Sequence, residues 1–176
     1  ARRAAELGPV DYLVPNAGIA ELGDSLDVAC FERQWAVNGA GALNTLAALR
    51  AELAKPASVV FVGTFLTRST FPGLAAYIAS KAALVAHART LAVEFAPLNV
   101  RINVVSPGPT ATAIWGTLGL AEEQLEQVAE GVTQRLLPGH FLESAAVANV
   151  ILFQLSQGAR GVYGQDWVVD NGYTLN

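Results

Sequence analysis

Features that mark several classes of protein are scarce or absent in this sequence. Its one cysteine, Cys30, excludes an internal disulfide framework and suits a reducing, cytoplasmic location. No second cysteine or histidine lies near Cys30 in the sequence, so we expect a buried structural thiol. The two histidines, His87 and His140, lack the spacing of metal ligands. The sequence therefore predicts neither a disulfide scaffold nor a metal site.

Charged residues and long apolar runs are scarce as well. Charged residues make up 15% of the chain and the net charge is −4 without a basic run, which argues against a nucleic-acid partner. No apolar run approaches the roughly 20 residues that span a bilayer. The start shows no signal-peptide pattern, so we expect a cytoplasmic protein without a membrane partner. With 52% hydrophobic residues in 176, the chain can form one core-rich globular domain.

The most informative stretch is Ala75–Leu84, where Tyr77 and Lys81 lie among small and apolar residues. Their spacing places them on one face of a helix, and a helix that is apolar nearly all round belongs in the interior. A lysine charge beside a phenol lowers a pKa that is about 10 in water. Tyr77 is thus a candidate acid or base for carbonyl–alcohol chemistry. Without other motifs, a packed tyrosine and a lysine that reaches water would be the commoner explanation.

Short apolar segments alternate with helical patterns, which predicts an α/β fold with parallel strands. The expected strands cover residues 10–14, 59–62, 100–105 and 164–170. The expected helices are the end of one at 1–7, then 27–53 with a bend at Asn38, 75–95, 122–128 and 145–155. Turns follow three of the strands at Pro15-Asn16-Ala17-Gly18, Gly63-Thr64 and Ser106-Pro107-Gly108. Ligands in open α/β sheets bind at such strand ends, although Asn16 and Gly18 also suit an ordinary turn.

Several motifs occur in a defined order along the chain. They are Pro15-Asn16-Ala17-Gly18, Asn38, Gly63-Thr64, Tyr77-x-x-x-Lys81, Asn103-Val104-Val105-Ser106-Pro107-Gly108 and Val168-Val169-Asp170-Asn171-Gly172. In this order and at these spacings, the chain resembles the short-chain dehydrogenase/reductase family from about Val10 to the C-terminus. The resemblance implies the C-terminal part of a doubly wound, Rossmann-like parallel sheet of about four strands. It also implies NAD(P)-dependent hydride transfer between a secondary alcohol and a ketone, in a homodimer or homotetramer.

The resemblance assigns roles to individual residues. Tyr77 would exchange the proton, Thr64 would position the substrate oxygen, Lys81 would lower the pKa of Tyr77, and Asn38 would hold a proton-relay water. The residues implied to contact NAD or NADP are Asn16, Ala17, Gly18, Tyr77, Lys81, Pro107, Gly108 and Thr112. Thr110 is better explained as a cap of the turn. Candidates for a substrate lid within residues 114–137 are Trp115, Leu118, Leu120 and Leu136.

The chain departs from the family pattern at three positions. Pro15 replaces an asparagine and lacks an N–H, Thr64 replaces a serine, and Asn171 replaces a glycine. The threonine keeps the hydroxyl but adds a methyl group, which could slow catalysis or narrow the pocket. Asn171 tolerates left-handed backbone, so its turn can survive.

No Gly-rich phosphate-binding motif stands near the start of the chain. We therefore expect residues 1–176 to form one partial Rossmann-type domain in which the first βαβαβ half is absent and the strand at 10–14 is an exposed edge. The chain would be part of a longer polypeptide, pair with another chain, or cover the edge with its own first segment; the start at Ala1 favours the first. The competing function is a non-catalytic module that keeps the oligomerisation helices, around 42–53 and 82–95, but binds no cofactor.

Overall fold

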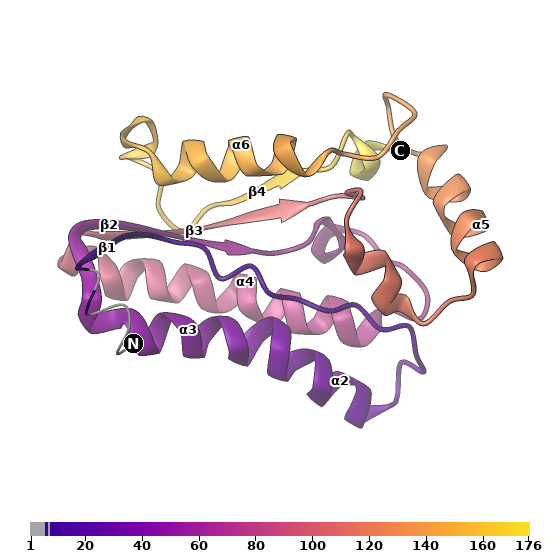
Figure 1. Cartoon of the computed structure of the whole chain (residues 1–176), viewed down its shortest axis with the longest axis horizontal. Coiled ribbons are helices and arrows are strands. Elements are labelled where there is room, and N and C mark those ends of the chain that lie inside the picture. Colours follow the sequence, from indigo (N-terminus) through magenta and orange to yellow (C-terminus); the bar gives the residue numbers. More distant parts are fainter. Residues whose placement is uncertain (1–5, 7) are drawn as a thin grey trace.

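Four parallel strands form the centre of the structure, a computed structural model that describes residue 6 and residues 8–176 (Figure 1). Their spatial order follows the chain: β1 (Val10–Leu13), β2 (Leu53–Val62), β3 (Val100–Pro107) and β4 (Asp166–Val169). All three neighbouring pairs are parallel. The predicted α/β fold with about four parallel strands is confirmed. The helix end expected at 1–7 falls almost wholly outside the described residues.

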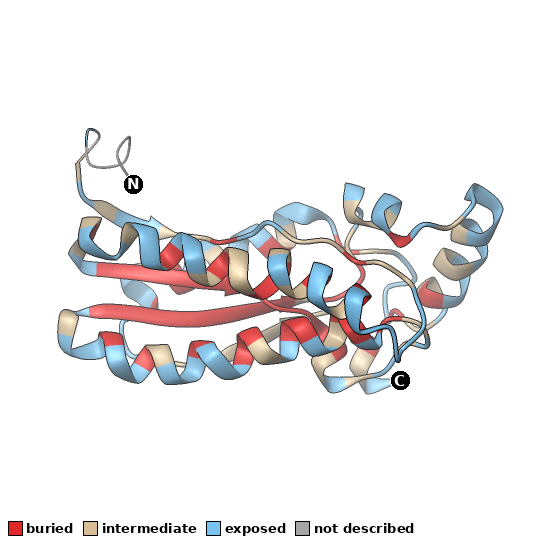
Figure 2. Cartoon of the chain, turned by 90° about the horizontal axis from the view of Figure 1, so that it is seen from below, coloured by how far each residue is buried: buried red, intermediate tan, exposed pale blue. Residues whose placement is uncertain are grey.

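Helices cover both faces of the sheet. On one face lie α2 (Val28–Trp35), α3 (Ala42–Leu49) and α4 (Ala75–Phe95), and on the other lies α6 (Ser144–Leu155), while α5 (Glu122–Thr133) stands beyond the strand ends (Figure 1). The burial pattern follows from this arrangement. The central strands β2 and β3 are covered on both sides, so residues 57–61 and 100–106 are buried, including polar residues such as Asn103. Figure 2 shows the buried residues concentrated in the strands and on the helix faces turned toward them.

The largest apolar cluster lies between the sheet and helices α3 and α4. Alternate strand residues such as Val59, Phe61 and Ile102 point into it and are fully buried. They meet Leu84 and Ala88 of α4, which are 0% and 1% exposed. The alanine-rich sequence of α4 brings its backbone close to the sheet. This packing fixes the helix that carries Tyr77 and Lys81.

The predicted disturbance at Asn38 is a π-helical turn, Ala36–Gly41, between α2 and α3. π-Turns within helices often occur at functional sites. Gly39 is needed here because a Cβ at this position would overlap the ring of Trp35. Glycine thus lets the tryptophan lie against the helix backbone, and the widened turn directs Asn38 into the protein interior.

The second strand begins earlier than the sequence indicated. We expected a helix to continue to Leu53, but α3 ends at Leu49, a 3₁₀ turn covers Arg50–Glu52, and Leu53 opens β2. Leu53 is 7% exposed and packs into the main apolar cluster. Burial of this side chain beneath the sheet therefore outweighs the local helical pattern.

Strand β1 is an edge strand. Among the described strands its one neighbour is β2, and the register between them shifts after Val10. Tyr12 is 57% exposed, as expected for a strand that lacks a second neighbour. Whether the first segment of the chain covers this edge falls on residues outside the described part. No described helix is long and apolar enough to cross a membrane.

Candidate active site

A cavity of about 660 Å³ lies at the carboxyl ends of the strands. The turns after β1, β2 and β3 meet there because the strands are parallel, and α4, α5 and the 3₁₀ segment Ala113–Leu118 close the sides. All but one of the predicted site residues line the cavity: Asn16, Ala17, Gly18, Thr64, Tyr77, Lys81, Pro107, Gly108 and Thr112. The exception is Asn38. The residues singled out from the sequence thus lie in one cavity, while the roles assigned to them stay predictions.

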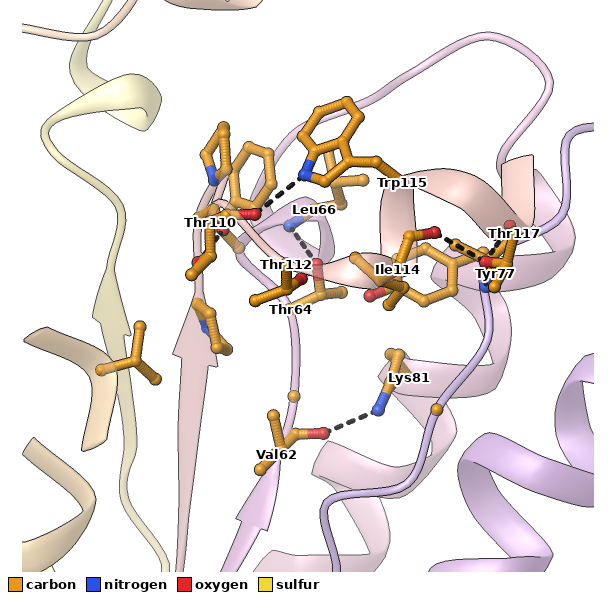
Figure 3. Close-up of a pocket in the computed structure, with 18 of the residues that line it drawn as sticks. Val62, Thr64, Leu66, Tyr77, Lys81, Thr110, Thr112, Ile114, Trp115 and Thr117 are labelled. Carbon is orange, nitrogen blue, oxygen red and sulfur yellow. Dashed lines mark hydrogen bonds between the residues drawn. The ribbon is translucent and has the colours of Figure 1, made fainter. Parts of the chain in front are cut away.

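Tyr77 and Lys81 project from α4 into the same cavity and are 8% and 3% exposed. In Figure 3 the amine of Lys81 points toward the end of β2, where Nζ donates a hydrogen bond to the carbonyl oxygen of Val62 at 2.8 Å. The Tyr77 hydroxyl points toward the side of Thr64 (Figure 3). The amine is therefore held by the end of β2, and the phenol faces the threonine that follows the same strand.

Burial dominates the protonation of both groups. It raises the pKa of Tyr77, and the hydrogen bond with Thr64 lowers it by a smaller amount. Burial also lowers the pKa of Lys81 to about 8. The expectation that Lys81 lowers the pKa of Tyr77 is wrong for this structure, because the lysine charge is not among the causes acting on the phenol. The reason is desolvation of the phenol by burial.

Asn38 lies behind the cavity and is completely buried. Its Oδ1 accepts a hydrogen bond from the N–H of Ile19 at 2.9 Å, and its Nδ2 donates to the Ile19 carbonyl and to the Ser80 hydroxyl, both at 3.0 Å. Ser80 in turn donates to the main-chain carbonyl of Tyr77 at 2.7 Å. The side chain of Asn38 thus fastens the turn after β1 to α4, and its predicted part in a proton relay is untested.

Two glycines permit close approaches on the floor of the cavity. A Cβ on Gly18 would lie 3.2 Å from Oδ1 of Asn38 and 3.4 Å from Nζ of Lys81. A Cβ on Gly108 would overlap the backbone of Asp170. The turn after β3 can therefore lie against the end of β4 only because Gly108 has no side chain, and Gly18 leaves room for the Asn38 and Lys81 side chains beside the turn after β1.

Thr110 and Thr112, both in the segment after β3, differ in their hydrogen bonds. The Thr110 hydroxyl donates to the carbonyl of Gly108 at 2.9 Å, and its own carbonyl accepts from the indole N–H of Trp115 at 2.8 Å. Thr110 therefore shapes the turn, as the sequence indicated. The hydroxyl of Thr112 has no hydrogen-bond partner among the described residues and lines the cavity, so it is available to a ligand.

Thr117 lines the roof of the cavity, and the sequence did not indicate it. Thr117 accepts a hydrogen bond from the N–H of Ala20 at 3.0 Å and donates to the carbonyls of Ala20 and Ile114 at 2.9 and 2.7 Å. It therefore joins the segment after β1 to the segment after β3, a contact between residues 97 positions apart that no local pattern signals.

The lid was only partly predicted. Trp115 and Leu118 line the cavity, whereas Leu120 and Leu136 pack in the adjoining apolar cluster without lining it. Apolar residues of an irregular segment all resemble lid residues in the sequence, and the packing alone distinguishes them.

The floor of the cavity fits the nicotinamide end of a dinucleotide. It combines a buried cation at Lys81, the free hydroxyl of Thr112 and two turns without side chains at Gly18 and Gly108. Backbone that approaches a ligand closely is a common use of glycine. No described group of histidine, cysteine, aspartate or glutamate could hold a metal ion.

Comparison with known proteins supports the same assignment. A family profile described as Enoyl-(Acyl carrier protein) reductase matches residues 1–174. The chain belongs to the short-chain dehydrogenase/reductase family. A curated member of this family, 2,3-dihydro-2,3-dihydroxybenzoate dehydrogenase of Bacillus subtilis, is 33% identical over 99% of this chain and 70% of its own length. Cyclopentanol dehydrogenase of Comamonas sp. is 33% identical over 98% of this chain and 69% of its own length.

A solved family structure gives the same result. The angucycline C-6 ketoreductase LanV with bound NADP superimposes with a TM-score of 0.84 and 28% identity, over 96% of this chain and 64% of that one. The chain thus spans about two thirds to 70% of the length of these relatives. The similarity covers all four strands described above and the cavity at their ends.

Proposed function

We propose that this chain carries the substrate-binding side of an NAD(P)-dependent oxidoreductase that interconverts a secondary alcohol and a ketone. The observation that carries the proposal is the convergence of the Tyr77 and Thr64 hydroxyls and the Lys81 amine in one cavity. The names of both curated relatives describe dehydrogenases, one acting on cyclopentanol and the other on a dihydroxylated benzoate, which supports an alcohol as substrate.

The hydroxyls of Thr64 and Tyr77 have different roles at the substrate oxygen. Thr64 orients this oxygen, and Tyr77 donates a proton to it during reduction. Because burial raises the pKa of Tyr77, the phenol stays protonated at neutral pH. The free chain is thus set up for reduction, while alcohol oxidation needs the phenol deprotonated and should speed up with rising pH.

The remaining site residues would hold the nucleotide. The bound nicotinamide supplies the hydride in reduction and accepts it in oxidation. Lys81 and Thr112 offer donors to it, and the turns at Asn16-Ala17-Gly18 and Pro107-Gly108 form its floor. The pKa of Lys81 is about 8, so this amine is largely charged at pH 7. Discrimination between NAD and NADP depends on contacts beyond these residues.

Replacement of Tyr77 by phenylalanine tests the proposal. Tyr77→Phe removes one oxygen and should reduce ketone turnover with NADH or NADPH by about 10²–10⁴-fold, the usual contribution of a positioned acid. Tyr163→Phe is the matched control, because Tyr163 is 39% exposed and does not line the cavity. Equal turnover by the two variants would remove Tyr77 from the mechanism.

A second candidate function is a non-catalytic module that self-associates through its helices. Two observations favour it: the sequence lacks a Gly-rich phosphate-binding motif near its start, and among the described residues β2 is the one strand that pairs with β1. Exposed apolar residues such as Val93 on α4, which is 75% exposed, could support a homodimer or homotetramer. Calorimetric titration with NADH and NADPH separates the two functions, since micromolar binding by this chain contradicts the module. Analytical ultracentrifugation of the same sample measures the oligomeric state.

A further inference from the structure

We infer that the cavity accepts an uncharged, largely apolar alcohol or ketone and rejects substrates that carry a carboxylate or another anionic group. This inference rests on the proposed function and narrows it to a class of substrate. It follows from the chemistry of the wall that faces Tyr77 and Thr64, from the position of the nearby cations, and from the way the remaining polar groups are occupied.

The wall on the substrate side is built from hydrocarbon. Five separate segments contribute to it: the loop after β1, the 3₁₀ turn after β2, the loop before α4, the 3₁₀ segment after β3, and α5. Their cavity-lining side chains include Leu22, Leu66, Phe71, Leu118, Val128 and Val132. Most belong to one apolar cluster, which also contains Tyr77 itself. A substrate seated against the phenol is therefore surrounded by groups that offer it no hydrogen bond.

Lys81 is the one charged side chain among the described residues that line the cavity. Its amine is bonded to the carbonyl of Val62 and lies beside Gly18, on the floor where the nucleotide would sit (Figure 3). An anionic substituent on the far side of the substrate, against the apolar wall, would not reach this amine. The lysine therefore cannot serve as the counter-ion of a substrate carboxylate while it contacts the nucleotide.

Two arginines near the cavity are occupied elsewhere. Arg135 lies over the ring of Tyr173 at 4.0 Å, donates to its hydroxyl at 3.0 Å, and donates to the carbonyl of Asn176 at 2.7 Å. Arg68 is paired with Asp166 at 3.3 Å. Neither arginine lines the cavity. Among the described residues, no cation is thus placed to receive an anion at the substrate position.

The polar groups beside the apolar wall can serve one oxygen atom. Thr117 uses its hydroxyl for three contacts to main-chain atoms, and Thr110 uses its hydroxyl within its own turn. Tyr173 also lines the cavity, and its hydroxyl accepts a hydrogen bond from Arg135. Beside the apolar wall this leaves the hydroxyls of Thr64 and Tyr77. They suit a single carbonyl or alcohol oxygen on an otherwise apolar molecule.

The cost of an unpaired anion in such a cavity is large. A buried charge without a partner is destabilised by several kcal/mol, and each tenfold change in affinity corresponds to about 1.4 kcal/mol. A carboxylated substrate should therefore bind on the order of 100-fold more weakly than its neutral ester, although the ester is the larger molecule.

A pair of aromatic ketones tests this inference with the whole chain. Methyl 4-acetylbenzoate and 4-acetylbenzoate share the ring and the ketone and differ in charge. We expect the ester to bind, by calorimetry and by tryptophan fluorescence, at least about 100-fold more tightly than the acid. Dissociation constants within about threefold of each other, or no binding of the ester at millimolar concentration, would overturn the inference. If the ester binds selectively but is reduced with neither NADH nor NADPH, the class of ligand stands and the proposed function fails.

A substitution at the rim of the cavity tests whether the absence of a cation causes the weak binding of the anionic ketone. Phe71 lines the cavity from a loop and is half-buried, so a longer polar side chain can be accommodated there. Phe71→Arg should strengthen binding of 4-acetylbenzoate by about tenfold or more, and Phe71→Gln is the uncharged control that should not. Equal gains by the two variants would contradict a charge-based exclusion. Circular dichroism of both variants checks that the fold is kept.

Discussion

Replacement of the buried lysine should make this protein more resistant to unfolding. Lys81→Met keeps a flexible chain of similar length and removes the ammonium group. The pKa of Lys81 falls from 10.5 in the unfolded chain to about 8 in the folded protein, because burial penalises the charged form. At pH 7 the Lys81 amine is charged in both states, but the native protein binds its proton less tightly than the unfolded chain does. The substitution removes this cost together with the proposed function of the residue.

The size of the effect follows from the difference between the two pKa values. At 1.36 kcal/mol per pH unit, the charged lysine lowers the free energy of unfolding at pH 7 by about 3 kcal/mol. The variant also loses the hydrogen bond to the carbonyl of Val62, which costs about 1–3 kcal/mol if that oxygen is left without a partner. The net gain at pH 7 should therefore be about 1 kcal/mol, and the dependence on pH is the sharper test.

The direction of the pH dependence is set by linkage. Between about pH 8 and pH 10.5 the unfolded chain binds more protons at Lys81 than the native protein, so the wild-type free energy of unfolding rises with pH in this window. Lys81→Met lacks this contribution. The difference between the variant and the wild type should therefore change by about 2 kcal/mol between pH 7 and pH 9.5, from an advantage of about 1 kcal/mol to a disadvantage of about 1 kcal/mol. The raised pKa of Tyr77 adds the opposite dependence only above about pH 10.

Urea unfolding at four pH values between 7 and 9.5 measures this difference. Lys55→Met is the matched control, since Lys55 is the other lysine of the chain and is exposed on β2. Its difference from the wild type should not depend on pH. A Lys81→Met variant that is less stable at pH 7, with a difference that stays constant across the range, would refute the reasoning that burial depresses the pKa of this lysine.

Three other substitutions test separate parts of the structure. Thr64→Ser keeps the hydroxyl and should hold turnover within about threefold of the wild type. Thr64→Ala should lower kcat by about 10²–10³-fold, which is the usual effect of removing one hydrogen-bond donor to a reacting oxygen. Thr117→Val removes the hydroxyl that joins the roof to Ala20, and should raise KM several-fold with a smaller change in kcat. Gly39→Ala sets a methyl group against the Trp35 ring and should lower the free energy of unfolding by about 1–3 kcal/mol.

Steady-state kinetics and urea unfolding check these three predictions, each with its own contradictory result. Equal kcat for Thr64→Ser and Thr64→Ala would show that the hydroxyl does not act in turnover. An unchanged KM for Thr117→Val would show that the roof contact does not support substrate binding. Wild-type stability of Gly39→Ala would mean that the tryptophan ring moves freely away from the π-helical turn.

The parallel strands and the site at their ends could be predicted from the sequence because each depends on regular local patterns. Apolar segments of strand length alternate with helical segments, and parallel strands bring their carboxyl ends together at one edge. The spacing of Tyr77 and Lys81 was sufficient to place both on one side of α4. The family resemblance then predicted that the turns after β1, β2 and β3 belong to one site. In the structure these turns line one cavity.

Contacts between distant segments could not be predicted in this way. The bond between Thr117 and Ala20 joins residues 97 positions apart, and Thr117 stands in a segment without a regular pattern. The early start of β2 depends on where Leu53 is buried, and helical propensity in its neighbourhood pointed the other way. Neither feature has a signal in sequence spacing, because each is decided by packing against another part of the chain.

The protonation of Tyr77 and Lys81 shows why a motif is insufficient for a mechanism. Spacing places a tyrosine and a lysine one turn apart, and the proximity of a charge then argues for a more acidic phenol. The same interior that makes the pair unusual also removes water from both groups, which disfavours the phenolate and the ammonium alike. Desolvation is a property of the whole wall, which five separate segments build. The interior that these segments build therefore favours a protonated tyrosine, which the spacing of Tyr77 and Lys81 alone could not show.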